Sequence, residues 1–164
     1  MGADEVIEVF IEIPKGSRNK YEYDHDRHVM RLDRRLFSAT VYPADYGFIP
    51  DTLGEDGDPL DALVLVQDPT FPGCLVQARP VGVIWMEDEK GRDAKIICVP
   101  VPDPVLETVS DISELPSHLM AEIQHFFDVY KMLEPGKEST TGGVGDHREA
   151  RAEIAAARER AAKS

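Results

Sequence analysis

The chain has 164 residues, with 31 acidic and 18 basic side chains and a formal net charge of −13. Its length is typical of one domain, and its hydrophobic content of 42% is enough for a packed core. The negative charge disfavours nucleic acid and anionic membranes as partners, because both are polyanions. No segment resembles a signal peptide or is long enough to span a membrane, so we expect a cytoplasmic protein.

The segment from Glu5 to Ile13 alternates between apolar and polar residues. Alternation with a period of two predicts a strand with one buried face, and Pro14 and Gly16 end it. Glu12 belongs to the opposite face of this strand. Considered alone, it is best interpreted as a residue that faces solvent.

Two more strands are predicted at residues 19–24 and 29–36. In the first, Lys20 and Glu22 share one face, and a surface ion pair worth at most ~1 kcal/mol is the simplest interpretation. The second strand carries several arginines, among them Arg34. Beyond them, Tyr42 and Tyr46 flank a Pro-Ala-Asp turn, a position typical of half-buried packing residues.

An acidic turn at residues 51–62 precedes an apolar strand at residues 63–66. Asp56, Asp58 and Asp61 stand within six residues of one another, with Gly57 and Pro59 between them. One interpretation is a solvated acidic loop. The other is a site for Mg²⁺ or Ca²⁺, which prefer hard oxygen ligands. The spacing of an EF-hand calcium loop is absent.

A hairpin is predicted next, from strands at residues 74–86 and 94–101 joined by the loop at 87–93. Asp88 and Asp93 lie in this loop, and Lys95 follows it. Alone, such a loop is usually solvated, and metal binding by it is the less common alternative.

The chain then changes to helical spacing. A helix is predicted over 116–133, with Tyr130 and Lys131 near its C-terminal end. Residues 138–145 are rich in Ser, Thr and Gly and are expected to form a loop. A capping box of Asp146 and Glu149 predicts a final helix over about 146–163, which we expect to pack lightly because Ile154 is its only large aliphatic residue. Short strands followed by helices indicate a mainly β fold with helices, either a small barrel or a strongly bent sheet.

With these segments described, the chain resembles the bacterial family I soluble inorganic pyrophosphatases. The similarity runs from about Val6 to Lys137 and includes EDGDPLD at 55–61, the signature of that family. Other matching blocks are IEIPKG at 11–16, NKYE at 19–22, LDR at 32–34, YPADYGFI at 42–49, ARPVGV at 78–83, DEKGRDAK at 88–95 and HFFDVYKMLEPGK at 125–137. The segment ESTTGGVG at 138–145 departs from the family pattern, which has a tryptophan-containing sequence there.

The resemblance implies an OB-like five-stranded β-barrel flanked by helices, with residues 1–164 forming a single inorganic pyrophosphatase domain. It also implies roles for individual residues in Mg²⁺-dependent hydrolysis of pyrophosphate to two orthophosphates, by a metal-activated water and without a covalent intermediate. Asp58 corresponds to the proton acceptor. The remaining roles are metal ligands (Glu12, Asp56, Asp61, Asp88, Asp93), phosphate-binding residues (Lys20, Arg34, Tyr46, Tyr130, Lys131) and supporting residues (Glu22, Tyr42, Lys95).

Several Mg²⁺ ions per site are implied, with Mn²⁺ or Zn²⁺ as possible substitutes, and similar bacterial proteins form homohexamers. A non-catalytic OB-like module that binds metal or phosphate is the alternative. A third hypothesis is a structural calcium-binding protein, which would not need the Lys, Arg and Tyr set. Enzymatic activity distinguishes these hypotheses.

Overall fold

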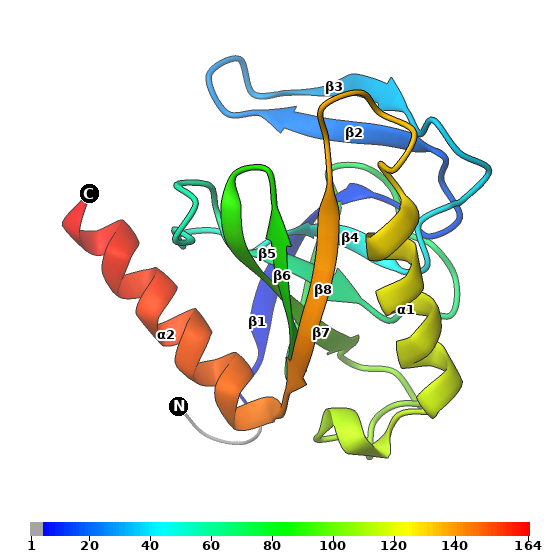
Figure 1. Cartoon of the computed structure of the whole chain (residues 1–164). Helices are drawn as coiled ribbons and strands as arrows, with labels where there is room; N and C mark the ends of the chain where they lie inside the picture. The colour runs from blue at the N-terminus through cyan, green and yellow to red at the C-terminus, as the bar shows by residue number, and fades with distance from the viewer. Residues whose placement is uncertain (1–4) are drawn as a thin grey trace.

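The computed structural model describes residues 5–164 and contains a five-stranded barrel (Figure 1). One sheet has the strand order β1-β4-β5-β7-β6-β8, and β1 also pairs with β6, which closes the first five strands into a ring. The predicted OB-like five-stranded barrel is therefore confirmed. The strands are β1 (Ile7–Ile13), β2 (Asn19–Asp24), β3 (Val29–Arg35), β4 (Asp45–Phe48), β5 (Asp61–Val64), β6 (Leu75–Asp88), β7 (Gly91–Pro100) and β8 (Ser139–Gly145).

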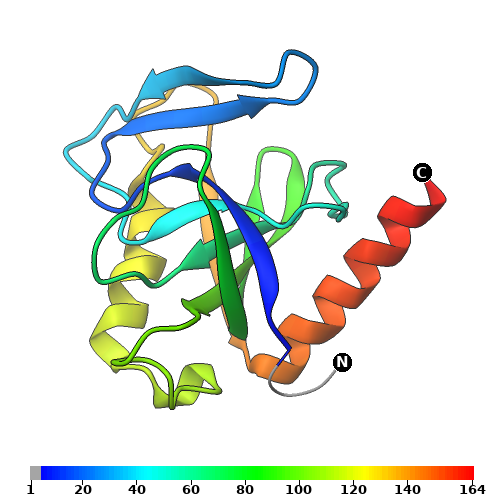
Figure 2. The same cartoon turned by 180° about the vertical axis from the view of Figure 1, so that it is seen from behind.

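Strands β2 and β3 form a separate two-stranded antiparallel ribbon. Both views of the molecule show this ribbon lying across one end of the barrel (Figures 1 and 2). The predicted hairpin of β6 and β7 is also present, but its strands are longer than expected. Asp88 and Gly91 are paired, so only Glu89 and Lys90 remain as the turn. The tight turn fixes the direction in which the neighbouring acidic side chains project.

The segment at 138–145 is not the loop that we predicted, because residues 139–145 form strand β8. This strand pairs antiparallel with the second half of β6, from Val83 to Asp88. Thr141 also donates to the Asp128 carboxylate through its backbone N–H at 2.8 Å. Backbone groups at the edge of β6 thus pair with those of β8. This pairing between distant segments outweighs the low strand propensity of the glycine-rich sequence.

Two α-helices cover opposite sides of the barrel (Figure 1). Helix α1 (Ser117–Val129) follows a short 3₁₀ helix, η1 (Ile112–Glu114), and buries Ile123, Phe126 and Phe127. It ends earlier than predicted, and Tyr130 to Leu133 continue as turns. Tyr130 and Lys131 therefore follow directly after the helix, whose C-terminal end lies at the same end of the barrel as the ribbon (Figure 1).

Helix α2 (His147–Lys163) begins at the predicted capping box. Asp146 accepts from the Glu149 backbone at 3.0 Å, and Glu149 accepts from the Asp146 backbone at 2.9 Å. Its apolar residues Ala150, Ile154 and Ala157 are fully buried in the core, and Arg151 is also buried. Within residues 5–164, no helix is both long enough and apolar enough to cross a membrane.

Candidate active site

A polar pocket of about 310 Å³ lies between the β2–β3 ribbon, the acidic turn before β5, the β6–β7 hairpin and the end of α1. Thirteen of the fourteen predicted site residues line it, and Tyr42 is the exception. These thirteen are Glu12, Lys20, Glu22, Arg34, Tyr46, Asp56, Asp58, Asp61, Asp88, Asp93, Lys95, Tyr130 and Lys131. Among these predicted residues, the structure brings together side chains up to 119 positions apart in the chain, from Glu12 to Lys131.

The acidic turn is organised by its own backbone. Asp56 accepts from the Asp58 backbone N–H at 3.0 Å, and the Gly54 N–H donates to the Asp58 carbonyl at 2.6 Å. Gly57 has a φ of 89°, in the left-handed region that glycine adopts without strain. This compact turn directs Asp56 and Asp58 into the pocket, and Asp61 follows as the first residue of β5.

Lys95 lies at the centre of the buried part of the site. It is the partner of Asp61 in the parallel pairing of β5 and β7, and its Nζ lies 2.7 Å from the Asp61 carboxylate. The same ammonium is 2.8 Å from the Asp93 carboxylate and donates to the Tyr46 hydroxyl at 2.7 Å. Burial alone would lower the pKa of Lys95, but attraction to Asp61 raises it well above its usual value. Lys95 therefore stays cationic.

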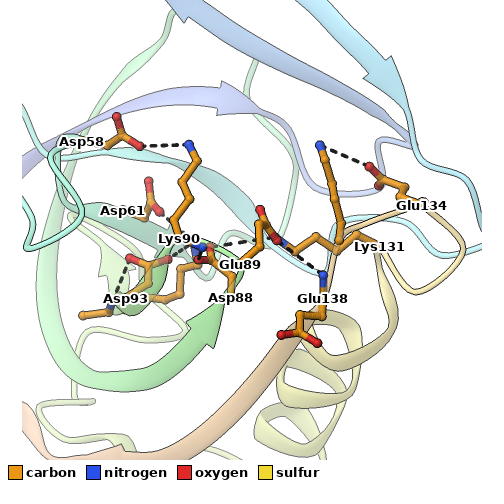
Figure 3. A network of polar contacts seen from close by, with 12 residues as sticks. Asp58, Asp61, Asp88, Glu89, Lys90, Asp93, Lys131, Glu134 and Glu138 are labelled. Carbon is orange, nitrogen blue, oxygen red and sulfur yellow. Dashed lines mark hydrogen bonds and ion pairs between the residues drawn. The ribbon is translucent and has the colours of Figure 1, made fainter.

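The hairpin turn faces the end of α1 across the pocket (Figure 3). Lys131 Nζ lies 2.9 Å from Glu89 Oε1 and 3.9 Å from the Asp88 carboxylate. On the other side of the turn, Lys90 Nζ lies 3.7 Å from the Asp58 carboxylate. Lysines thus balance part of the negative charge of the hairpin and of the acidic turn.

The ribbon contributes two cations side by side. Lys20 and Arg34 are direct cross-strand partners, an arrangement that repels unless an anion lies between or beside them. Asp33 supplies such an anion, because its carboxylate contacts Lys20 at 3.2 Å and also the Arg34 guanidinium. Both cations line the pocket, where a phosphate group can receive their remaining hydrogen bonds.

Several carboxyl groups here have raised pKa values, chiefly because burial disfavours their charged form. Burial raises the pKa of Glu12 to about 7, although the Tyr23 N–H donates to it and lowers the shift. Burial also raises the pKa values of Asp56 and Asp61, and Asp93 repels both. A bound cation would reverse these shifts.

The tyrosines of the site are held by aromatic packing. Tyr42 is 1% exposed, lies outside the pocket and packs against Tyr46 and Phe126, with ring centroids 5.4 and 4.7 Å away. Tyr130 stacks on Phe126 at 5.2 Å. Burial raises the pKa values of Tyr42 and Tyr46 well above 10, so both hydroxyls stay protonated at neutral pH.

The predicted ligands are all carboxylates, the donors that hard divalent cations prefer. Among residues 5–164, no three His, Cys, Asp or Glu side chains converge as a ready-made metal cage. Magnesium does not require such a cage, since it usually keeps several waters and binds through one or two carboxylates plus substrate phosphates. The lining residues therefore fit Mg²⁺-type binding, with water and phosphate oxygens completing the shell.

Four charged residues of the pocket were not singled out from the sequence: Asp33, Glu89, Lys90 and Lys137. Asp33 lies beside Arg34 in the LDR block, and Glu89 and Lys90 form the hairpin turn in DEKGRD. Their position inside matching blocks was the signal that could have identified them.

Comparison with known proteins agrees with this geometry. The family model described as inorganic pyrophosphatase matches residues 9–162. The chain belongs to the inorganic pyrophosphatase family. It is 57% identical over 148 residues to an inorganic pyrophosphatase of Streptomyces coelicolor, covering 90% of this chain and 91% of the relative.

Other pyrophosphatases are similarly close. The inorganic pyrophosphatase of Methanosarcina mazei is 56% identical over 152 residues, which cover 93% of this chain and 89% of the relative. The crystal structure of the inorganic pyrophosphatase from Thermus thermophilus superposes with a TM-score of 0.95 at 49% identity, covering 99% of this chain and 94% of that one. The resemblance found in the sequence motifs is thereby confirmed, and with it the assignment to an enzyme family.

Proposed function

We propose that the chain hydrolyses inorganic pyrophosphate to two orthophosphates in the pocket under the β2–β3 ribbon. The observation that carries this proposal is the convergence of thirteen predicted site residues in one pocket of a family member. The pocket is lined by nine carboxylates and six Lys or Arg side chains, so it is acidic overall. A polyanion would be repelled from it unless cations were also bound.

We assign the metal-ligand role to Glu12, Asp56, Asp61, Asp88 and Asp93. Bound Mg²⁺ ions would neutralise phosphate charge and lower the pKa of a coordinated water from ~15.7 towards ~7. Mn²⁺ or Zn²⁺ are the proposed substitutes. In support, the pKa values of Glu12, Asp56 and Asp61 are raised by burial and by neighbouring negative charge.

We assign phosphate binding to two residues of the ribbon, Lys20 and Arg34, and to three residues outside it, Tyr46, Tyr130 and Lys131. Arginine and lysine donate strong, charge-assisted hydrogen bonds to phosphate oxygens, and buried tyrosine hydroxyls donate while staying neutral. Held between these groups, pyrophosphate would be oriented for in-line attack, and the cations would stabilise negative charge that develops on the leaving phosphate.

Asp58 is the proposed proton acceptor for the attacking water. It lies on the rim, with its side chain 61% exposed, and Lys90 Nζ lies 3.7 Å from its carboxylate. Direct attack by water requires no covalent nucleophile. Three residues support the site: Lys95 holds Asp61 and Asp93 together, Tyr42 packs against Tyr46, and Glu22 lines the pocket beside Lys20 on the same strand.

The test is phosphate release from pyrophosphate by the purified protein, with Mg²⁺ and with excess EDTA. Rapid release that EDTA abolishes is the expected result. Folded protein that releases no phosphate with Mg²⁺, Mn²⁺ or Zn²⁺ would support the alternative, a non-catalytic OB-like module that binds metal or phosphate. Repeating the assay with each metal alone ranks Mg²⁺ against the substitutes.

The resemblance to bacterial pyrophosphatases extends the proposal to a cytoplasmic homohexamer that binds neither nucleic acid nor membranes. The net charge of −13 supports the last two points, because it repels polyanions. Light scattering after size-exclusion chromatography measures the assembly directly. A particle with the 18.3 kDa mass of one chain would contradict the hexamer.

A further inference from the structure

A buried carboxylate lies directly behind the phosphate-binding side of the pocket. Glu134, in the turns after α1, is 5% exposed and does not line the pocket. Its Oε1 lies 2.7 Å from Arg34 Nε and 3.5 Å from Lys137 Nζ. Its Oε2 and Arg34 Nε are both buried without a hydrogen-bond partner among the described residues, so the 2.7 Å contact is an ion pair and not an aligned hydrogen bond. The negative charge of Glu134 is therefore balanced mainly by Arg34.

The other ion pair of Arg34 is made within its own ribbon. It lies near the end of β3, on a two-stranded ribbon that is not part of the barrel sheet. Two-stranded ribbons are marginally stable by themselves. Asp33, which also contacts the guanidinium, belongs to the same ribbon and cannot anchor it to another element. In the described part of the chain, the ion pair with Glu134 joins Arg34 to a different element.

The turn that carries Glu134 begins at Lys131. The Glu134 backbone N–H donates to the Lys131 carbonyl at 3.1 Å, so this turn fixes the position of Glu134 relative to Lys131. Figure 3 shows both residues in the segment that follows α1. Glu134 thus links the position of Arg34, on the ribbon, to that of Lys131, at the helix end. Glu134 contacts Arg34 at Nε and Asp33 contacts it at Nη1, and the same side chain lines the pocket.

We propose that Glu134 is a positioning residue, which acts through Arg34 and holds this guanidinium at a fixed distance from Lys131. Arg34 and Lys131 can then both contact one bound phosphate group, and neither side chain has to change its position. The inference rests on the proposed function, because it assigns Arg34 and Lys131 to phosphate binding. A purely structural role for the pair would affect stability alone.

The test uses Glu134→Gln, which keeps the shape of the side chain and removes its charge. We expect KM for pyrophosphate to rise and kcat/KM to fall about 10-fold to 100-fold, since small misplacements of binding groups have effects of this size. Calorimetry with inorganic phosphate should show weaker binding as well. Glu122→Gln, the same change on the exposed side of α1, is the control and should behave like the wild type.

A double-mutant cycle separates positioning from general stability. In an Arg34→Ala background, Glu134→Gln should change kcat/KM less than about 3-fold, because the group that it positions is gone. An equal fold-loss in both backgrounds, or wild-type kinetics for Glu134→Gln, would overturn the inference. If Glu134→Gln does not fold, Glu134→Asp replaces it. This variant keeps the charge but moves it away from Arg34 by the length of one methylene. Wild-type kinetics for Glu134→Asp would likewise overturn the inference. Absence of activity in the wild type would instead refute the proposed function.

Discussion

Lys95 and Asp61 are direct partners in the parallel pairing of β5 with β7, and their charged groups meet at 2.7 Å. Because Lys95 also contacts Asp93 at 2.8 Å, one buried ammonium balances two of the proposed metal ligands. The strand register itself therefore brings these carboxylates together before any metal arrives. Their shared contact with Lys95 then holds Asp61 and Asp93 beside each other.

The first prediction concerns this internal cation. Lys95→Met should destabilise the metal-free protein by about 3–5 kcal/mol, because it leaves Asp61 and Asp93 largely desolvated without their common partner. Added Mg²⁺ should then raise the Tm of the variant more than that of the wild type, since the metal replaces the missing charge. Thermal unfolding in EDTA and in Mg²⁺ measures both effects. Lys163→Met, at the exposed end of α2, is the control, and equal Mg²⁺ shifts in variant and wild type would contradict the argument.

The second prediction separates proton transfer from metal binding. Asp58→Asn keeps the size of the side chain but removes the basic oxygen, so kcat should fall by about 10²-fold to 10⁴-fold. Because Asp58 is not among the proposed ligands, Mg²⁺ affinity measured by calorimetry should change little. Asp26→Asn, in the exposed turn between β2 and β3, serves as the control. Full activity of Asp58→Asn would exclude it as the proton acceptor.

Local sequence patterns predicted the elements that carry the site. Alternation identified β1, whose residues Ile7, Val9, Ile11 and Ile13 are all buried. The Gly and Pro residues of the acidic turn likewise indicated that Asp56 and Asp58 would be held on a rigid loop. These features depend on neighbouring residues, and so they can be recognised without knowing the fold. The roles of the individual site residues came from the resemblance and stay predictions.

The features that were missed depend on contacts between distant segments. Strand β8 has a glycine-rich sequence of low strand propensity, and only the edge of β6 makes it a strand. Glu134 belongs to a matching block, yet nothing in its neighbourhood indicates that Arg34, 100 residues earlier, is its partner. Similarly, the ion pair of Glu89 with Lys131 joins the hairpin to the end of α1. Such pairs become visible only once the elements are packed.

The third prediction concerns pH and stability. Asp111 joins η1 to the start of α2, because it accepts from the Ser113 N–H at 3.0 Å and from the His147 N–H at 2.9 Å. Burial alone would raise the pKa of Asp111, but hydrogen bonds from Ser113 and His147 outweigh it and hold the pKa well below its usual value. A depressed carboxyl pKa contributes stability above the unfolded-state value of about 3.9, and this contribution is lost as the pH falls through the lower folded-state value.

Asp111→Asn should therefore lower the free energy of unfolding most at pH 6–8, and the difference from the wild type should shrink progressively as the pH falls below about 4. Urea unfolding at a series of pH values measures this difference. Glu107→Gln is a control with the same chemical change at an exposed position. A difference that stays constant between pH 7 and pH 3 would show that Asp111 does not act through its charge.

The fourth prediction asks whether α2 is an integral part of the fold. The sequence suggested light packing, since Ile154 is the only large aliphatic residue of the helix, and this residue is 0% exposed in the structure. Ile154 packs in the cluster that contains the β1 residues Val9 and Ile11, so its truncation would leave a cavity against the barrel. Ile154→Ala should cost about 2–5 kcal/mol of unfolding free energy if the helix unfolds together with the barrel.

Denaturant unfolding followed by both tryptophan fluorescence and circular dichroism tests this expectation, because Trp85 lies on β6 and α2 dominates the helical signal together with α1. Coincident transitions that shift together in Ile154→Ala would mean that helix and barrel form one cooperative unit. Val105→Ala, at a 66% exposed position, should change stability by less than about 0.5 kcal/mol. An unchanged barrel transition with an earlier loss of helical signal would instead mean that α2 detaches on its own, as light packing implies.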